Sequence, residues 1–148
     1  MKNTKGEFVF NFYRLSHKLY NKRWSNSHPI RILYKIIVQY ILCIDIPDST
    51  MIGDNFQIYH GFGIVINEKA VIGRNVTIRQ NTTIGNSKEG SPSPKIGNNV
   101  NIGANCIIIG DIKVGNNVII GAGSVVTKNV PENTIIVGNP AKIIKHIK

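Results

Sequence analysis

Branched aliphatic residues recur every six positions over most of this 148-residue chain, beginning at Ile46. The first phase comprises Ile46, Ile52, Ile58 and Ile64, and after a slip of two residues the series continues with Ile66, Ile72, Ile78, Ile84, Ile96, Ile102, Ile108, Val114, Ile120 and Val126. Only position 90, a Gly, interrupts it. A fixed six-residue period with inward Ile or Val predicts a parallel β-helix of hexapeptide repeats, in which three short strands form one triangular turn.

Three repeats in each turn predict that residues eighteen positions apart stack on one another. Ile84 would then stack on Ile102, and Ile78 on Ile96. The interruption coincides with a polar stretch at residues 86–95 that is rich in Ser and Pro. Because the period keeps its phase on both sides, we expect this stretch to project from a corner as a loop, in place of one buried repeat. Loops mounted on a rigid scaffold commonly carry function.

Residues 1–45 follow a helical pattern instead. An apolar stripe runs from Phe8 to Tyr20, and Trp24 closes it before a polar break at residues 25–29. Because a short β-helix leaves its ends exposed, we expect capping segments on both sides. The predicted organisation is a helical N-terminal segment (1–45), a β-helix domain (46–131) and a C-terminal tail (132–148).

A second helix is predicted from about Ile30 to Cys43. Its polar side chains, Arg31, Lys35 and Gln39, fall four residues apart on one narrow stripe, and the remaining circumference is apolar. Such a helix needs cover on most sides. The cover is either another helix together with a partner subunit, or a membrane interface.

The composition agrees with a strand-rich fold. The chain contains 27 Ile and 12 Val against 4 Leu, and β-branched side chains suit a pleated, half-buried surface. Its 18 Asn and 14 Gly tolerate the left-handed backbone conformation of tight corners. Hydrophobic residues make up 42% of the chain, which excludes a disordered protein. We therefore expect an all-β protein with a short α-helical N-terminal segment.

The net charge of +10 is concentrated near the N-terminus, since residues 1–47 carry eight basic and two acidic side chains. This excess favours phosphates or an anionic membrane surface as partners, although a basic face that aids solubility has the same composition. Cys43 and Cys106 form neither a CxxC pair nor a disulfide framework, which favours a reducing compartment. The chain shows no cleavable leader and no stretch of ~20 apolar residues. We expect a cytoplasmic protein whose residues 1–45 either stay in solution or contact the inner membrane peripherally.

Three motifs within the repeats resemble those of the left-handed β-helix acyltransferases. They are YHGFGIVI at residues 59–66, IRQNTTIG at 78–85 and IIIGDI at 107–112. Within that superfamily the chain is similar to the serine acetyltransferase branch, and to its short relatives that O-acetylate bacterial exopolysaccharides such as colanic acid. The segments GAGSVVTK (121–128) and VGNPAK (137–142) resemble the coenzyme A end of these enzymes. The resemblance implies a left-handed helix and direct acetyl transfer from acetyl-CoA to an acceptor hydroxyl.

His60 is the only His in the repeat region, and by the resemblance it occupies the catalytic position. Imidazole suits a general base because its ordinary pKa lies near neutral pH. A corner His that only satisfies a backbone hydrogen bond is the alternative. A general base usually leans on a third group, for which Glu68 is one candidate.

Serine acetyltransferases carry an Asp before the catalytic His and an Asp-Arg-His-Pro-Lys motif in the loop. This chain has Tyr59 at the first place and SPSPK (91–95) at the second. The charged groups that would hold an amino acid zwitterion are therefore missing. We expect a neutral acceptor, a saccharide hydroxyl, with free serine as the alternative. The candidates to bind the acceptor are Tyr59, Arg79, Asn81 and Ser93.

Acetyl-CoA needs an apolar slot for its pantetheine arm and cations for its phosphates. The small residues Ala104, Gly121 and Ala122 fit the slot, because they leave backbone amides accessible. For the phosphates the candidates are Lys128, Lys142 and Lys145 as compact point charges, with Thr127 beside them. Ordinary solvent exposure is the alternative for each lysine, and no metal is expected.

Other function classes fit less well. A γ-type carbonic anhydrase needs three His ligands for zinc, and the repeats contain one. Ranks of outward Thr, as in ice-binding β-helices, and the signatures of nucleic-acid binding are missing. A non-catalytic β-helix interaction module stays open as the alternative class. A triangular prism buries one face per neighbour under threefold symmetry, and the enzymes it resembles place each site between subunits, so we expect a homotrimer.

Overall fold

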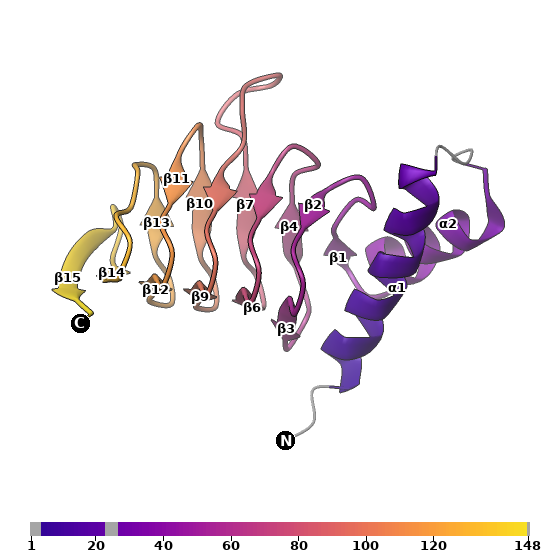
Figure 1. Ribbon diagram of the computed structural model, residues 1–148, viewed down its shortest axis with the longest axis horizontal. Coiled ribbons are helices and arrows are strands. Elements are labelled where there is room, and N and C mark those ends of the chain that lie inside the picture. Colours follow the sequence, from indigo (N-terminus) through magenta and orange to yellow (C-terminus); the bar gives the residue numbers. More distant parts are fainter. Residues whose placement is uncertain (1–3, 23–26, 148) are drawn as a thin grey trace.

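The computed structural model, which describes residues 4–22 and 27–147, is a left-handed parallel β-helix with helices packed against its N-terminal end (Figure 1). The predicted fold class is confirmed. Trp24 and residues 25–26 of the predicted polar break lie outside the described residues.

Three sheets form the faces of the prism. Sheet A contains β1 (Ile44–Asp45), β4 (Ile64–Ile66), β7 (Thr83–Gly85), β10 (Ile107–Ile109) and β13 (Val125–Val126). Sheet B contains β2 (Met51–Ile52), β5 (Val71–Ile72), β8 (Lys95–Ile96) and β11 (Lys113–Val114). Sheet C contains β3 (Gln57–Tyr59), β6 (Thr77–Arg79), β9 (Asn101–Ile102), β12 (Ile119–Ile120), β14 (Thr134–Val137) and β15 (Lys142–His146).

The aliphatic series found in the sequence forms the core of the prism. Every member from Ile58 to Val126 is buried and exposes 3% of its surface or less. Neighbouring residues such as Val65 and Ile107 point to the outside, because successive side chains of a strand alternate between its two faces. The repeating Ile and Val side chains therefore face inward and form the core, while their neighbours face outward.

The stacking interval differs from the predicted eighteen residues at several turns. Ile84 pairs with Ile108, at an interval of 24 residues, so the predicted stacking of Ile84 on Ile102 is wrong. The predicted stacking of Ile78 on Ile96 is wrong as well, because Ile96 pairs with Ile72. The stretch between β7 and β8 is therefore added to a complete set of three repeats instead of replacing one, and it projects from the prism in Figure 1. The interval is 20 residues between Ile58 and Ile78 in the first turn.

Corner asparagines form a ladder along the edge between sheets B and C. The members are Asn55, Asn75, Asn99, Asn117 and Asn133, all with φ of 56° or 57°. The side-chain amide of each donates to the side-chain oxygen of the next at 2.8–3.0 Å. Asn reaches the left-handed region more easily than most residues because its short polar side chain bonds locally. The corner role predicted for Asn is confirmed on this edge.

The N-terminal cap consists of α1 (Thr4–Asn21), α2 (Pro29–Tyr34) and a π-helix, η1 (Lys35–Ile41), that continues directly from α2. His28 starts α2, where its Nδ1 accepts from Ile30 N at 3.3 Å. The second predicted helix is therefore present but changes its winding at Lys35. Within the described ranges, no helix combines the length and the apolar character that a membrane span requires.

The cap is packed firmly onto the first turn. The rings of Phe10 and Phe56 lie 5.8 Å apart, and the hydroxyls of Tyr13 and Tyr34 donate to Thr50 O and Ile46 O. Burial is the largest influence on both hydroxyls and raises their pKa above the ordinary value for Tyr. Both therefore stay protonated donors at neutral pH.

Asp48 joins both helices to the first turn. Arg31 of α2 donates from Nε and Nη2 to the two carboxylate oxygens at 2.7 and 3.0 Å, and Ser16 of α1 donates to one of them at 2.6 Å. Burial alone would raise the pKa of the Asp48 carboxyl, but these hydrogen bonds outweigh it and hold the pKa below its ordinary value.

Residues of the predicted C-terminal tail extend sheet C. β14 pairs in parallel with β12, and β15 then returns antiparallel along β14. All five residues of β15 are exposed. A hairpin of two strands therefore closes this side of the last turn.

Candidate active site

Most of the predicted site residues lie along one edge of the prism, where the strands of sheet C turn into those of sheet A. We call it the C/A edge. It carries His60 between β3 and β4, Asn81 between β6 and β7, Ala104 between β9 and β10, and Ala122 between β12 and β13. Backbone hydrogen bonds link its levels, for example from Gly123 N to Ala104 O at 2.8 Å.

His60 belongs to a two-residue insertion in this edge. Tyr59 pairs with Arg79 and Val65 with Thr83, and five residues lie between Tyr59 and Val65 where three lie between Arg79 and Thr83. His60 adopts a left-handed φ of 52°, and its side chain is exposed. The insertion thus bulges the corner outward and presents the imidazole on it.

Gly61 and Lys5 hold this bulge in place. A Cβ on the buried Gly61 would lie 2.8 Å from Ile58 Cγ2 and 2.9 Å from Ile44 Cδ1, so the backbone packs directly on the core and only Gly fits. The Lys5 ammonium, from the first turn of α1, donates to Gly61 O. The N-terminal helix therefore touches the peptide next to His60. Nothing in the sequence pattern indicated this contact.

Three of the candidate acceptor-binding residues lie close to His60 on the same edge. The Arg79 guanidinium lies over the Tyr59 ring at 5.9 Å, and its Nη1 donates to Asn101 Oδ1 at 2.6 Å. Asn81 donates to Asn105 Oδ1 at 3.1 Å. Tyr59 and Arg79 therefore form a fixed aromatic and cationic surface beside His60.

Ser93 lies on a different edge, between sheets A and B. It is buried and donates to Asn67 Oδ1 at 3.0 Å. Glu68 follows β4 on that same edge and is not hydrogen-bonded to His60. Among the described residues, the His60 imidazole makes no hydrogen bond or ion pair, and no group of three or more His, Cys, Asp or Glu could hold a metal ion. Among the described residues of one chain, no side chain therefore orients His60, the predicted base.

The three small residues predicted for the pantetheine arm share the C/A edge with His60. Successive corners touch here, since a Cβ on Gly103 would lie 2.5 Å from Ala122 N and one on Gly121 would lie 2.8 Å from Val137 Cγ2. Ala122 is exposed and Ala104 is half-buried. The edge therefore offers accessible backbone without large side chains, which fits an extended pantetheine arm.

Cys106 is buried beneath the same edge. Its Sγ lies 3.2 Å from Gly121 O. Burial is the largest influence on the thiol and raises its pKa. Cys106 is therefore a core residue and not a nucleophile.

The residues predicted for the phosphates are divided between two places. Thr127 and Lys128 follow β13 on the edge between sheets A and B, whereas Lys142 and Lys145 lie on β15 at the end of sheet C. All four are exposed. Lys142 is next to Ala141, whose N donates to Val125 O at 2.9 Å, so β15 begins close to the last level of the C/A edge.

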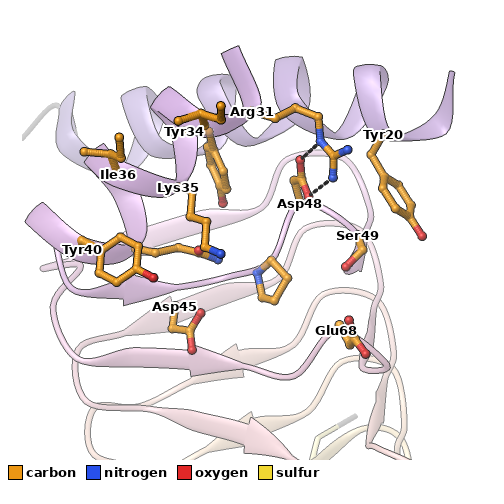
Figure 2. A pocket seen from close by; sticks show the side chains of 13 residues that line it. Tyr20, Arg31, Tyr34, Lys35, Ile36, Tyr40, Asp45, Asp48, Ser49 and Glu68 are labelled. Carbon is orange, nitrogen blue, oxygen red and sulfur yellow. Dashed lines mark hydrogen bonds and ion pairs between the residues drawn. The ribbon is translucent and has the colours of Figure 1, made fainter. Parts of the chain in front are cut away.

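A pocket of about 950 Å³ lies elsewhere, between the cap and sheet A. Figure 2 shows Lys35 and Tyr40 extending from the helix above it toward the turns that carry Asp45 and Glu68. The predicted polar stripe of Arg31, Lys35 and Gln39 lines this pocket. His60 is not among the residues that line it, so the predicted base does not act from inside this pocket.

Comparison with known proteins decides the family. Residues 93–128 match the protein family described as "Bacterial transferase hexapeptide (six repeats)". The acetyltransferase WcaB of Escherichia coli (strain K12), named for colanic acid biosynthesis, is 41% identical over 140 residues, which cover 88% of this chain and 85% of that protein. The chain belongs to the hexapeptide-repeat transferase family.

Serine acetyltransferases are similar to this hexapeptide-repeat transferase as well. Serine acetyltransferase 2 of Arabidopsis thaliana is 36% identical over 145 residues, covering 97% of this chain and 44% of that protein. The structure of serine acetyltransferase from Brucella abortus strain S19 in complex with coenzyme A has a TM-score of 0.84 at 34% identity, covering 97% of this chain and 57% of that chain. The chain thus spans about half the length of the serine acetyltransferases it matches. The hexapeptide-repeat transferase is an acyltransferase enzyme, and the predicted resemblance is confirmed.

Proposed function

We propose that this acyltransferase moves an acetyl group from acetyl-CoA directly to a saccharide hydroxyl, with His60 as the general base. The observation that carries the proposal is the insertion at the C/A edge, which exposes His60 beside Tyr59 and Arg79, on the same edge as the small residues Ala104 and Ala122. A general base and a slot for the acyl donor thereby lie along the same edge of the prism, the C/A edge.

The reaction follows from this placement. The His60 imidazole accepts the proton of the acceptor hydroxyl, and the oxygen attacks the carbonyl carbon of the thioester. The tetrahedral intermediate then collapses, the C–S bond breaks, and the imidazolium returns the proton to the departing sulfur. The products are an acetyl ester and free coenzyme A. No acyl group is held on the protein.

The donor would lie along the C/A edge toward β15. Its pantetheine arm fits beside Ala104, Gly121 and Ala122, where backbone amides are accessible. Lys142 and Lys145 at the end of sheet C are then in line to bind phosphates. Thr127 and Lys128 lie on the edge between sheets A and B, away from this path. They would therefore contact an acetyl-CoA molecule that is bound between this subunit and a neighbouring one.

The acceptor is proposed to be a saccharide because the neutral Tyr59 precedes His60 where serine acetyltransferases carry an Asp, so the carboxylate that would pair with the ammonium group of serine is missing at that position. Arg79, whose Nη1 donates to Asn101 Oδ1, keeps its positive charge beside the Tyr59 ring. The WcaB relative, which matches over most of its length, supports the same class of acceptor. Free serine is the second candidate, favoured by the serine acetyltransferases of similar fold and sequence.

A homotrimer is proposed as the working form. The outward residues of sheet A stand in register, and three of the five are apolar: Asp45, Val65, Thr83, Ile107 and Val125. The corresponding row of sheet B begins with Met51 and Val71 and continues with the charged Lys95 and Lys113. Sheet A is therefore the face suited to burial against a neighbour, and it adjoins the C/A edge, so the neighbour could supply the orienting group that His60 lacks.

A mass-spectrometric screen tests both the activity and the acceptor. The purified protein is incubated with acetyl-CoA and either a panel of saccharides or serine, and products heavier by one acetyl group are recorded. We expect an acetylated saccharide and a fall in turnover of about 10²- to 10⁴-fold in His60→Asn, the usual cost of losing a general base. His146→Asn, an exposed His on β15, is the matched control.

Acetylation of serine alone would overturn the acceptor class. Full turnover in His60→Asn would overturn the catalytic role of His60. Absence of any transfer with every acceptor would favour the non-catalytic interaction module.

A further inference from the structure

The outer face of the N-terminal cap is unusually apolar. α1 buries Val9, Phe10 and Tyr13 against the first turn, and the opposite face of the helix carries Phe8 and Leu15. In α2 and η1, Tyr34 and Val38 are buried and the opposite side is again apolar. The exposed apolar residues of these two outer faces that do not line the pocket between the cap and sheet A are Phe8 (49%), Leu15 (46%), Leu33 (50%) and Ile41 (67%). We call this set the cap patch. An exposed apolar patch of this extent marks an interaction surface.

Basic side chains surround the cap patch. Lys18 follows Leu15 by three residues and shares its face of α1, Lys22 comes directly after the helix ends at Asn21, and Arg14 is exposed as well. Glu7 is the only acidic residue in the described helices. The cap thus combines apolar side chains with a surplus of positive charge, which is the composition of helices that lie in the interface of an anionic bilayer.

The charge argues against a second copy of the chain as the occupant. A symmetric dimer would place this patch against itself, and would bring Lys18 and Lys22 close to the same lysines of the partner. Like charges that meet in an interface are unfavourable. An anionic surface, in contrast, attracts the same lysines.

We propose that the cap patch docks on an anionic lipid bilayer, with α1, α2 and η1 lying in its interface. Docking itself does not depend on the proposed function, but its purpose, acetyl transfer at the membrane surface, rests on that function. α1 packs on the first turn, and Lys5 touches the peptide next to His60, so docking would hold the His60 end of the C/A edge near the membrane. An acceptor saccharide carried on a lipid would then meet the general base at the membrane surface.

Vesicle flotation with the full-length protein tests the proposal without acetyl donor or acceptor. We expect binding to vesicles of phosphatidylcholine with phosphatidylglycerol, and binding at least tenfold weaker to phosphatidylcholine alone or at high salt. Lys18→Gln with Lys22→Gln should weaken the binding about thirtyfold, since two charges near the surface are removed. Lys95→Gln with Lys113→Gln removes two exposed charges from sheet B and should leave binding unchanged.

The apolar contribution is tested with Leu33→Ser and Ile41→Ser together, which should weaken binding by more than tenfold. Circular dichroism of each variant verifies that the fold is retained. Equal binding to both kinds of vesicle, or no effect of either pair of substitutions, would overturn the proposal. The proposal would also be overturned if the protein formed an assembly in solution and the pair Leu33→Ser and Ile41→Ser dissociated it, because the patch would then join copies of this chain. Failure of acetyl transfer to soluble saccharides would count against the proposed function and not against docking.

Discussion

His60 has a left-handed φ, and Lys5 donates a hydrogen bond to the carbonyl of the neighbouring Gly61. We expect Lys5→Met to lower kcat about tenfold and to leave KM for acetyl-CoA nearly unchanged. The physical reason is that a charged hydrogen-bond donor to the corner is lost, worth about 1.5–3 kcal/mol, so the imidazole is no longer held in its productive position. Steady-state kinetics with a soluble acceptor measures both constants.

Lys5→Arg should recover part of the lost turnover, because it keeps a charged donor within reach of Gly61 O. Lys113→Met, on the outer face of sheet B, is the control and should behave like the unchanged protein. A lower melting temperature of Lys5→Met with unchanged kcat would show that Lys5 only stabilises the cap.

Asp48 makes the stability of the cap dependent on pH. Because the pKa of its carboxyl is lowered in the folded protein, the ionised group stabilises the fold fully above the ordinary Asp pKa of about 4, and this contribution is lost as the pH falls through the lower folded value. We expect Asp48→Asn to destabilise the protein by about 1–3 kcal/mol at pH 7, because Arg31 and Ser16 lose a charged partner. Urea unfolding at pH 7 and below pH 4 measures the difference, which should shrink at the lower pH.

Asp111→Asn alters an exposed carboxylate at another corner and should change stability little at either pH. A destabilisation by Asp48→Asn that is the same at pH 7 and at low pH would contradict the assigned role of the charge.

At the scale of single elements, the asparagine ladder allows backbone conformation and hydrogen bonding to be separated. Asn99 donates to Asn117 and accepts from Asn75 at a φ of 56°. We expect Asn99→Ala to cost about 2–4 kcal/mol, from two hydrogen bonds and the strain of Ala in the left-handed region. Asn99→Gly loses the same bonds without the strain and should be less destabilising by about 1–2 kcal/mol. Chemical denaturation measures both, and equal losses would mean that the ladder bonds alone stabilise the corner.

The strands and the core could be predicted because each repeat carries its own buried Ile or Val. The register across the loop could not be predicted, because the loop adds a whole number of six-residue repeats. The extra residues between β7 and β8 lengthen the stacking interval from eighteen to 24, which is one whole repeat. An insertion of one full period leaves the phase unchanged, so the sequence cannot distinguish a loop that replaces a repeat from one that is added.

The candidate site was only partly foreseen. Motifs that resemble those of the acyltransferases single out His60 and the small corner residues, which the structure brings to one edge, whereas the contact of Lys5 with Gly61 joins residues 56 positions apart and belongs to no motif. The two-residue slip in the series corresponds to the insertion at His60, which the sequence pattern alone did not predict.

At the scale of the whole molecule, the apolar face of sheet A predicts the assembly. We expect sedimentation equilibrium to show a trimer, and Ile107→Lys to shift it to the monomer, because a charge would be buried between subunits without a partner. Transfer activity should fall with the trimer, since the site adjoins the same face. Met51→Lys is the matched control, as Met51 is an exposed apolar residue on sheet B. A monomer with full activity would contradict this arrangement.

The hairpin of β14 and β15 has a consequence for solubility. A parallel β-helix grows by laying one strand beside the last, so an open final turn would act as a template on which further copies could stack into fibres. In sheet C that position is taken by β15, which runs in the opposite direction and exposes Lys142 and Lys145 along its length. A strand of another copy would meet reversed polarity and repelling charge there, so β15 acts as a stop against end-to-end polymerisation.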